Sequence, residues 1–93
     1  MTVSRMTGST ADRITRRLTE AFAPLDIKVV DESHLHKGHA GHRPGGESHF
    51  RVKITAAAFT GKTRLATHRM VYDVLADEIA GGVHALAIEA RAP

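Results

Sequence analysis

The stretch SHFRVKITA, residues 48–56, constrains the fold more than any other part of the chain, because apolar and polar side chains alternate through it without a break. Successive side chains of a β-strand point to opposite faces of a sheet. The alternation therefore predicts a strand whose solvent-facing side is basic and carries Arg51 and Lys53. Four apolar residues form the predicted buried side: Phe50, Val52, Ile54 and Ala56. A chain with this strand needs a sheet that is covered on one face only.

A first amphipathic helix is predicted over residues 9–25. Ser9 or Thr10 is a fitting N-cap, and Pro24 stops the helix near Phe22 because proline cannot continue helical hydrogen bonding. Five apolar residues recur at helical spacing and form its core-facing side: Ile14, Leu18, Ala21, Phe22 and Leu25. This helix can cover part of the sheet.

A second, longer helix is predicted from about residue 63 to residue 80, where a glycine pair ends it. Its predicted apolar stripe consists of Leu65, Tyr72, Leu75, Ala76 and Ile79. His68 falls at the centre of that stripe and is interpreted as a core histidine. Met70 and Val74 project from the opposite side, where they either form an apolar contact surface or are covered by the first helix. The carboxylates are spaced as a solvated helix face: Asp73, Asp77 and Glu78.

Two further strands complete the predicted sheet, over residues 26–33 and 83–91. The first is joined to the alternating strand by a long loop, of about 15 residues, and is expected to pair with it as an antiparallel hairpin. The last follows a helix, which favours parallel pairing through a right-handed crossover. The fold class is therefore α+β, a two-layer αββαβ sandwich in which a three-stranded mixed sheet has helices on one face and solvent on the other.

Length and composition exclude several classes of function. A chain of 93 residues has room for one core, and it contains no run of about 18 apolar residues that would cross a membrane. The N-terminus lacks an apolar signal segment, so a cytoplasmic location is expected. The chain contains no cysteine and shows no arrangement of a nucleophile with a base, so we expect neither an enzyme nor a small-molecule substrate. The net charge of +3 permits contact with nucleic acid.

Histidine is concentrated between the first two strands, where residues 34–42, HLHKGHAGH, hold four of the seven histidines in the chain. Neutral imidazole binds zinc, copper, nickel and iron, so His34, His36, His39 and His42 are candidate metal ligands. The alternative is a solvated connector, because the surrounding glycines leave the loop without fixed ligand geometry. His84 opens the last strand and is a candidate ligand or a packed edge residue; His49 is a second-rank candidate.

Several separated motifs resemble the BolA family. They are DES, the histidine- and glycine-bearing loop, GESHFRVKI, FTGK followed by THRMVYDVLADEI, and GGVHALAIEA, and they run in order from Ile14 to Ala90. The resemblance implies an αββαβ arrangement similar to the class II KH fold, with a short helical turn near residues 58–60. It also implies a single BolA-like domain over residues 10–93, after a flexible segment, residues 1–9.

The resemblance further implies a function. BolA-like proteins form heterodimers with monothiol glutaredoxins and share with them, and with glutathione, a [2Fe-2S] cluster used in iron–sulfur maturation or trafficking or in iron regulation. The family's C-terminal histidine ligand falls on His84, and a loop ligand falls on His39, with His36 and His42 in second rank. The absence of cysteine is consistent with this expectation, because the partner and glutathione would supply the sulfur.

Two rival functions remain open. Some members of the family are DNA-binding regulators, and five cations are the nucleic-acid candidates: Lys62, Arg64, Arg69, Arg51 and Lys53. The turn FTGKTR lacks the GxxG with which KH domains clamp RNA, which counts against KH-type RNA binding. The other rival is storage or sensing of zinc or copper by the histidine loop alone.

Overall fold

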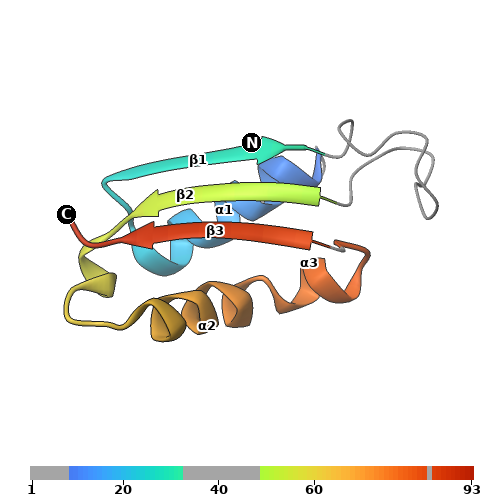
Figure 1. The fold of residues 1–93 in the computed structure, drawn as a ribbon. Helices are drawn as coiled ribbons and strands as arrows, with labels where there is room; N and C mark the ends of the chain where they lie inside the picture. Colours follow the sequence, from blue (N-terminus) through green and yellow to red (C-terminus); the bar gives the residue numbers. More distant parts are fainter. Residues whose placement is uncertain (1–8, 33–48, 84) are drawn as a thin grey trace.

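The alternating stretch forms the central strand of the sheet, β2 (His49–Thr55), in the computed structural model, which describes residues 9–32, 49–83 and 85–93. β1 (Asp26–Asp31) pairs with β2 in the antiparallel sense, and β3 (Ala85–Arg91) pairs with β2 in the parallel sense. The strand order is β1-β2-β3, and Figure 1 shows β2 and β3 running in one direction and β1 in the other. The predicted mixed sheet is confirmed.

The core lies between the helices and one face of the sheet. Every residue predicted for the buried side of β2 is at most 2% exposed, and α1 and α2 pack on that side. Full burial of one such aliphatic or aromatic side chain stabilises the fold by roughly 1.5–3 kcal/mol. The most deeply buried large side chains are Phe50, Ile14, Leu18, Ile54, Leu75, Val52 and Val71. The two-layer α+β class is therefore confirmed.

Helix α1 (Thr10–Phe22) begins and ends where local chemistry predicts. The Ser9 hydroxyl accepts a hydrogen bond from the Asp12 backbone at 3.1 Å, and the Asp12 carboxylate accepts one from the Ser9 backbone at 3.4 Å. Ser9 thus caps the helix, while residues 1–8 of the predicted N-terminal segment lie outside the described residues. The inclusion of Leu25 in the apolar face was wrong, because the helix ends before it and Leu25 is 73% exposed.

The second helical region differs from the prediction. It is broken at Leu75 into α2 (Arg64–Val74) and α3 (Ala76–Ala80), and its buried stripe is Thr67, Val71, Leu75 and Glu78. Leu65 and Tyr72, predicted to be core, are 61% and 42% exposed. Thr67 can replace them because its hydroxyl is satisfied by donating to the Arg64 carbonyl at 2.7 Å. Met70 and Val74 are partly buried and pack against the core, so of the two predicted alternatives they do not form a separate contact surface.

Glu78 joins the two helical regions and is not part of a solvated face. It is 8% exposed, and its carboxylate accepts hydrogen bonds from Arg17 at 3.0 Å and from Arg13 at 3.2 Å. Burial of a carboxylate is tolerated only when such partners replace water. Glu78 therefore links α3 to α1 through ion pairs, and its prediction as a solvated residue was wrong.

A short 3-10 helix, η2 (Ala57–Phe59), follows β2 within one residue of the expected position. The turn after it contains Gly61 with φ at 78°, a left-handed conformation that favours glycine. Thr63 then caps α2 by accepting a hydrogen bond from the Ala66 backbone at 3.0 Å. Among the described residues, no helix is long and apolar enough to cross a bilayer.

Candidate functional site

The described neighbours of the two predicted ligand segments lie at one end of the sheet. His49, which follows the histidine loop, is the register partner of Ala85, which follows position 84. Glu32, which precedes the loop, donates its backbone N–H to the His49 carbonyl at 2.8 Å. In Figure 1 this is the end where β1 stops and where β2 and β3 start. The residues that flank the histidine loop and the residue that follows position 84 therefore lie together at this end of the sheet.

The predicted ligands themselves lie outside the described residues. This holds for His39 and His84 and for the second-rank His36 and His42, because residues 33–48 and 84 are not described. His49 is half-buried at the start of β2, on the face opposite Phe50 as predicted. Within the ranges described, no three histidine, cysteine or acidic residues gather in a way that would hold a metal ion.

The open face of the sheet carries mixed charge and is not the basic face that the sequence predicts. Arg51 donates to Glu32 at 2.9 Å and also contacts Glu89 at 3.4 Å. The hydrogen bond to Glu32, together with the charge of that carboxylate, raises the pKa of Arg51, and Glu89 adds to the effect. Lys53 is exposed and stands in register between Lys28 and Glu89. Arg51 is therefore engaged by carboxylates of its own sheet.

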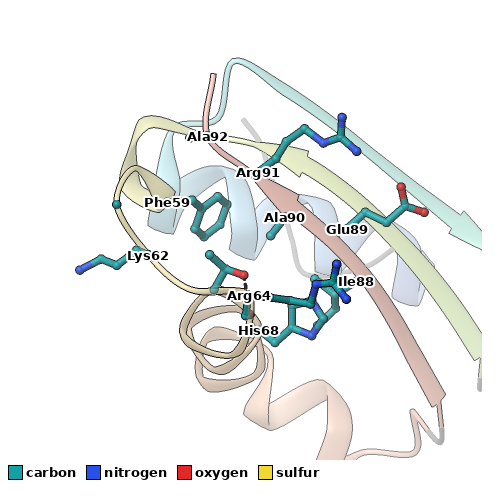
Figure 2. A pocket seen from close by; sticks show the side chains of 11 residues that line it. Phe59, Lys62, Arg64, His68, Ile88, Glu89, Ala90, Arg91 and Ala92 are labelled. Carbon is teal, nitrogen blue, oxygen red and sulfur yellow. Dashed lines mark hydrogen bonds between the residues drawn. The ribbon is translucent and has the colours of Figure 1, made fainter.

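A groove of about 700 Å³ opens at the other end of the sheet, between β3, the turn after η2 and the first half of α2. Figure 2 shows Arg64 and His68 extending from α2 toward β3, with Phe59 at the inner wall. The side chains of Glu89 and Arg91 point away from the groove, on the far side of β3. His68 is half-buried and lines this groove, so its prediction as a core residue was wrong.

The five nucleic-acid candidates do not form one surface. Lys62 and Arg64 line the groove, while Arg69 is exposed on α2 and is not part of the lining. Arg51 and Lys53 lie on the open face of the sheet, where Arg51 is ion-paired. The candidates therefore fall into two groups, one in α2 and the turn before it and the other on β2.

Comparison with known proteins identifies the family. The family model for BolA-like protein matches residues 18–93. The chain belongs to the BolA family. The BolA domain of SufE1 from Arabidopsis thaliana is a similar solved structure, with a TM-score of 0.83 and 40% identity over 94% of this chain and 95% of that one. The expected resemblance and the fold class are confirmed together.

Two relatives show what similar proteins are called. The Escherichia coli (strain K12) protein named DNA-binding transcriptional regulator BolA is 46% identical over 77 residues, which cover 83% of this chain and 70% of that protein. Human BolA-like protein 1 is 45% identical over 80 residues, which cover 86% of this chain but only 56% of the human protein. The expectations of a cytoplasmic location and of no enzymatic activity stay predictions.

The groove was missed by sequence reasoning. Its walls come from segments that are far apart along the chain, around residues 59–68 and residues 88–92. One local signal pointed to it: Gly61 and the N-cap Thr63 mark a tight entry into α2, next to two cations. The strand order, which the sequence motifs do not give, is what places β3 beside the start of α2.

Proposed function

We propose that this BolA-family chain is the partner of a monothiol glutaredoxin, with which it shares a [2Fe-2S] cluster in iron–sulfur maturation or trafficking or in iron regulation. One observation carries the proposal. The register pair His49–Ala85 and the hydrogen bond from Glu32 to His49 bring the flanks of the histidine loop and of position 84 to one end of the sheet. Ligands from two distant segments can serve one site only if the fold joins those segments.

The available donor atoms fit this role. The chain offers imidazole and no thiolate, so it can complete a cluster site only with sulfur from elsewhere. In the proposal, a glutaredoxin cysteine and glutathione hold one iron, while His84 and His39 supply ligands for the other. His36 and His42 are the second-rank loop ligands. Replacement of thiolate by neutral histidine raises the reduction potential of such a cluster.

The test is a reconstitution of the mixed complex. The chain is added to a cluster-loaded monothiol glutaredoxin with glutathione, and the stoichiometry and visible circular dichroism are recorded. We expect a one-to-one complex with a new spectrum, loss or strong change of that spectrum with His84→Ala, and a changed spectrum and faster cluster loss with His39→Ala.

Two histidine variants serve as matched controls. His34→Ala removes an imidazole from the same loop, and His68→Ala removes one from the groove at the other end of the sheet. Both should leave the spectrum unchanged. Unchanged spectra in both His84→Ala and His39→Ala would refute the proposed ligands. Zinc retained by the isolated chain, without any complex, would favour metal storage by the loop.

DNA binding is the second candidate, because the Escherichia coli relative is named as a DNA-binding regulator. The cations that support it are Lys62, in the turn before α2, and Arg64 and Arg69, on α2 itself. Contacts to phosphates make binding strongly salt-dependent. A gel shift with duplex DNA at physiological salt, repeated with Arg69→Glu, tests it: a shift that this variant weakens supports DNA binding, and no shift argues against it.

A further inference from the structure

β3 is an edge strand whose outer backbone groups can be assigned from two hydrogen bonds. The sheet order places β2 on one side of β3 and no other described strand on its second side. The Arg91 carbonyl accepts a hydrogen bond from the Ala56 backbone at 3.1 Å, so Arg91 points its backbone groups toward β2. The Leu86 carbonyl accepts one from the Tyr72 hydroxyl of α2 at 3.3 Å, so Leu86 points the opposite way.

Alternation along the strand extends this assignment. The N–H and C=O groups of one residue point to the same side of a strand, and the direction alternates from residue to residue. Ala87 and Glu89 therefore share the direction of Arg91 toward β2, whereas Ile88 and Ala90 share the outward direction of Leu86. Ile88 and Ala90 also line the groove. By this assignment, Ile88 and Ala90 direct four backbone hydrogen-bonding groups away from β2, on the side where no described strand satisfies them.

The charge around the groove selects the kind of ligand. Lys62 and Arg64 line it, and within the described parts of the chain neither forms an ion pair. The N-terminus of α2 adds partial positive charge on the same side. The one acidic side chain of the lining, Glu89, points to the other side of β3, where it contacts Arg51. The groove therefore favours an acidic ligand.

We propose that this groove binds an extended, acidic peptide segment of a partner protein, which adds to β3 as an additional strand. Backbone bonds to Ile88 and Ala90 would hold the peptide, and its acidic side chains would face Lys62 and Arg64. A single-stranded nucleic acid fits less well, because such sites depend on exposed aromatic rings on which bases stack. The aromatic ring in the lining, Phe59, is only 2% exposed. The proposal does not depend on the cluster site at the other end of the sheet.

The experiment uses a fluorescein-labelled octapeptide that alternates glutamate and valine. Binding is followed by fluorescence polarisation at low salt and by amide signals in ¹⁵N-resolved NMR spectra. We expect the peptide to shift the amide signals of Ile88 and Ala90 and to slow their hydrogen exchange by about tenfold or more, since the exchange of a bonded amide requires opening. The amides of Ala87 and Glu89, already bonded to β2, should show no such slowing.

Variants and altered probes separate this mode from simple charge attraction. The double variant Lys62→Glu/Arg64→Glu should weaken binding about tenfold, whereas Arg69→Glu, on the same helix but outside the groove, should change it less than about twofold. A peptide of the same charge in which every backbone amide is N-methylated loses the strand-pairing donors of both of its edges and should not bind. An alternating lysine–valine peptide should not bind either.

Three results would overturn the proposal. Equal binding of the N-methylated peptide would show charge attraction without strand addition. Peptide binding without any change at the Ile88 and Ala90 amides would place the peptide elsewhere. A twelve-residue oligothymidylate that shifts the groove signals, when the acidic peptide does not, would make the groove a nucleic-acid site.

Discussion

The alternation of backbone directions along β3 predicts that two alanine-to-proline substitutions, three residues apart, differ sharply in cost. Ala87 points its N–H into the ladder with β2, and Ala90 points its N–H out toward the groove. Proline has no N–H, so it is tolerated on an edge strand only where that group faces outward. Both positions carry the same small side chain, which makes the pair a matched comparison.

The magnitudes follow from what each substitution removes. Ala87→Pro deletes a ladder donor and leaves an acceptor on β2 without its partner, which costs about 1–3 kcal/mol, and the fixed φ near −65° adds strain in a strand. Ala90→Pro deletes no ladder bond, and the reduced entropy of the unfolded chain offsets part of its φ restriction by about 0.4–1 kcal/mol. We expect Ala87→Pro to be less stable than Ala90→Pro by about 2 kcal/mol.

Urea denaturation followed by circular dichroism measures the difference directly, and thermal unfolding gives a second reading. For a domain of this size, 1 kcal/mol corresponds to about 4–8 °C in Tm, so the two variants should differ by roughly 8–16 °C. Ala90→Pro should also weaken binding of the acidic octapeptide, because it removes one of the backbone N–H donors that point outward from β3. Equal destabilisation by the two prolines, or a larger loss at Ala90, would refute the assigned directions.

Three further predictions test other parts of the structure. Glu78→Gln should lower the free energy of unfolding by about 2–3 kcal/mol, because two arginines lose a charged acceptor. The control Asp77→Asn, at a side chain that is 84% exposed, should lower it by less than about 0.5 kcal/mol. Similar losses for the two variants in urea denaturation would contradict the buried role of Glu78. Ser9→Ala should cost about 1 kcal/mol by the same measurement, and an unchanged midpoint would mean that the capping box contributes nothing. The visible circular dichroism of the mixed glutaredoxin complex should fade on acidification around pH 6–6.5, because free imidazole gains a proton there and can no longer bind iron. A spectrum that persists well below this pH range would argue against histidine ligation.

The strands were predictable because their signal is local. A period of two needs only neighbouring residues, and the buried side of β2 was assigned correctly from nine letters of sequence. The cap of α1 was predictable for the same reason, since Ser9 and Asp12 are three residues apart. Hydrogen bonding and side-chain alternation over such short distances do not depend on the rest of the fold.

The face of the second helix was not predictable from apolar residues alone. Leu65 and Tyr72 follow a helical stripe, but the structure buries Thr67 and Glu78 in their place. Burial of these two depends on partners that hydropathy does not reveal: the Arg64 carbonyl for the threonine, and the arginines of α1, more than sixty positions earlier, for the glutamate. The same error placed His68 in the core, although it lines the groove.

The sequence by itself therefore determined the order of the elements, the α+β class and the family, because periodicity, caps and motifs are read along the chain. Only the tertiary structure decided which segments meet. The pairing of His49 with Ala85 joins the flanks of the two predicted ligand segments at one end of the sheet. The edge position of β3 beside α2 forms the groove at the other end. The shared end of the sheet and the groove both depend on strand order and register. Long-range packing determines these, so they cannot be predicted from any short stretch of sequence.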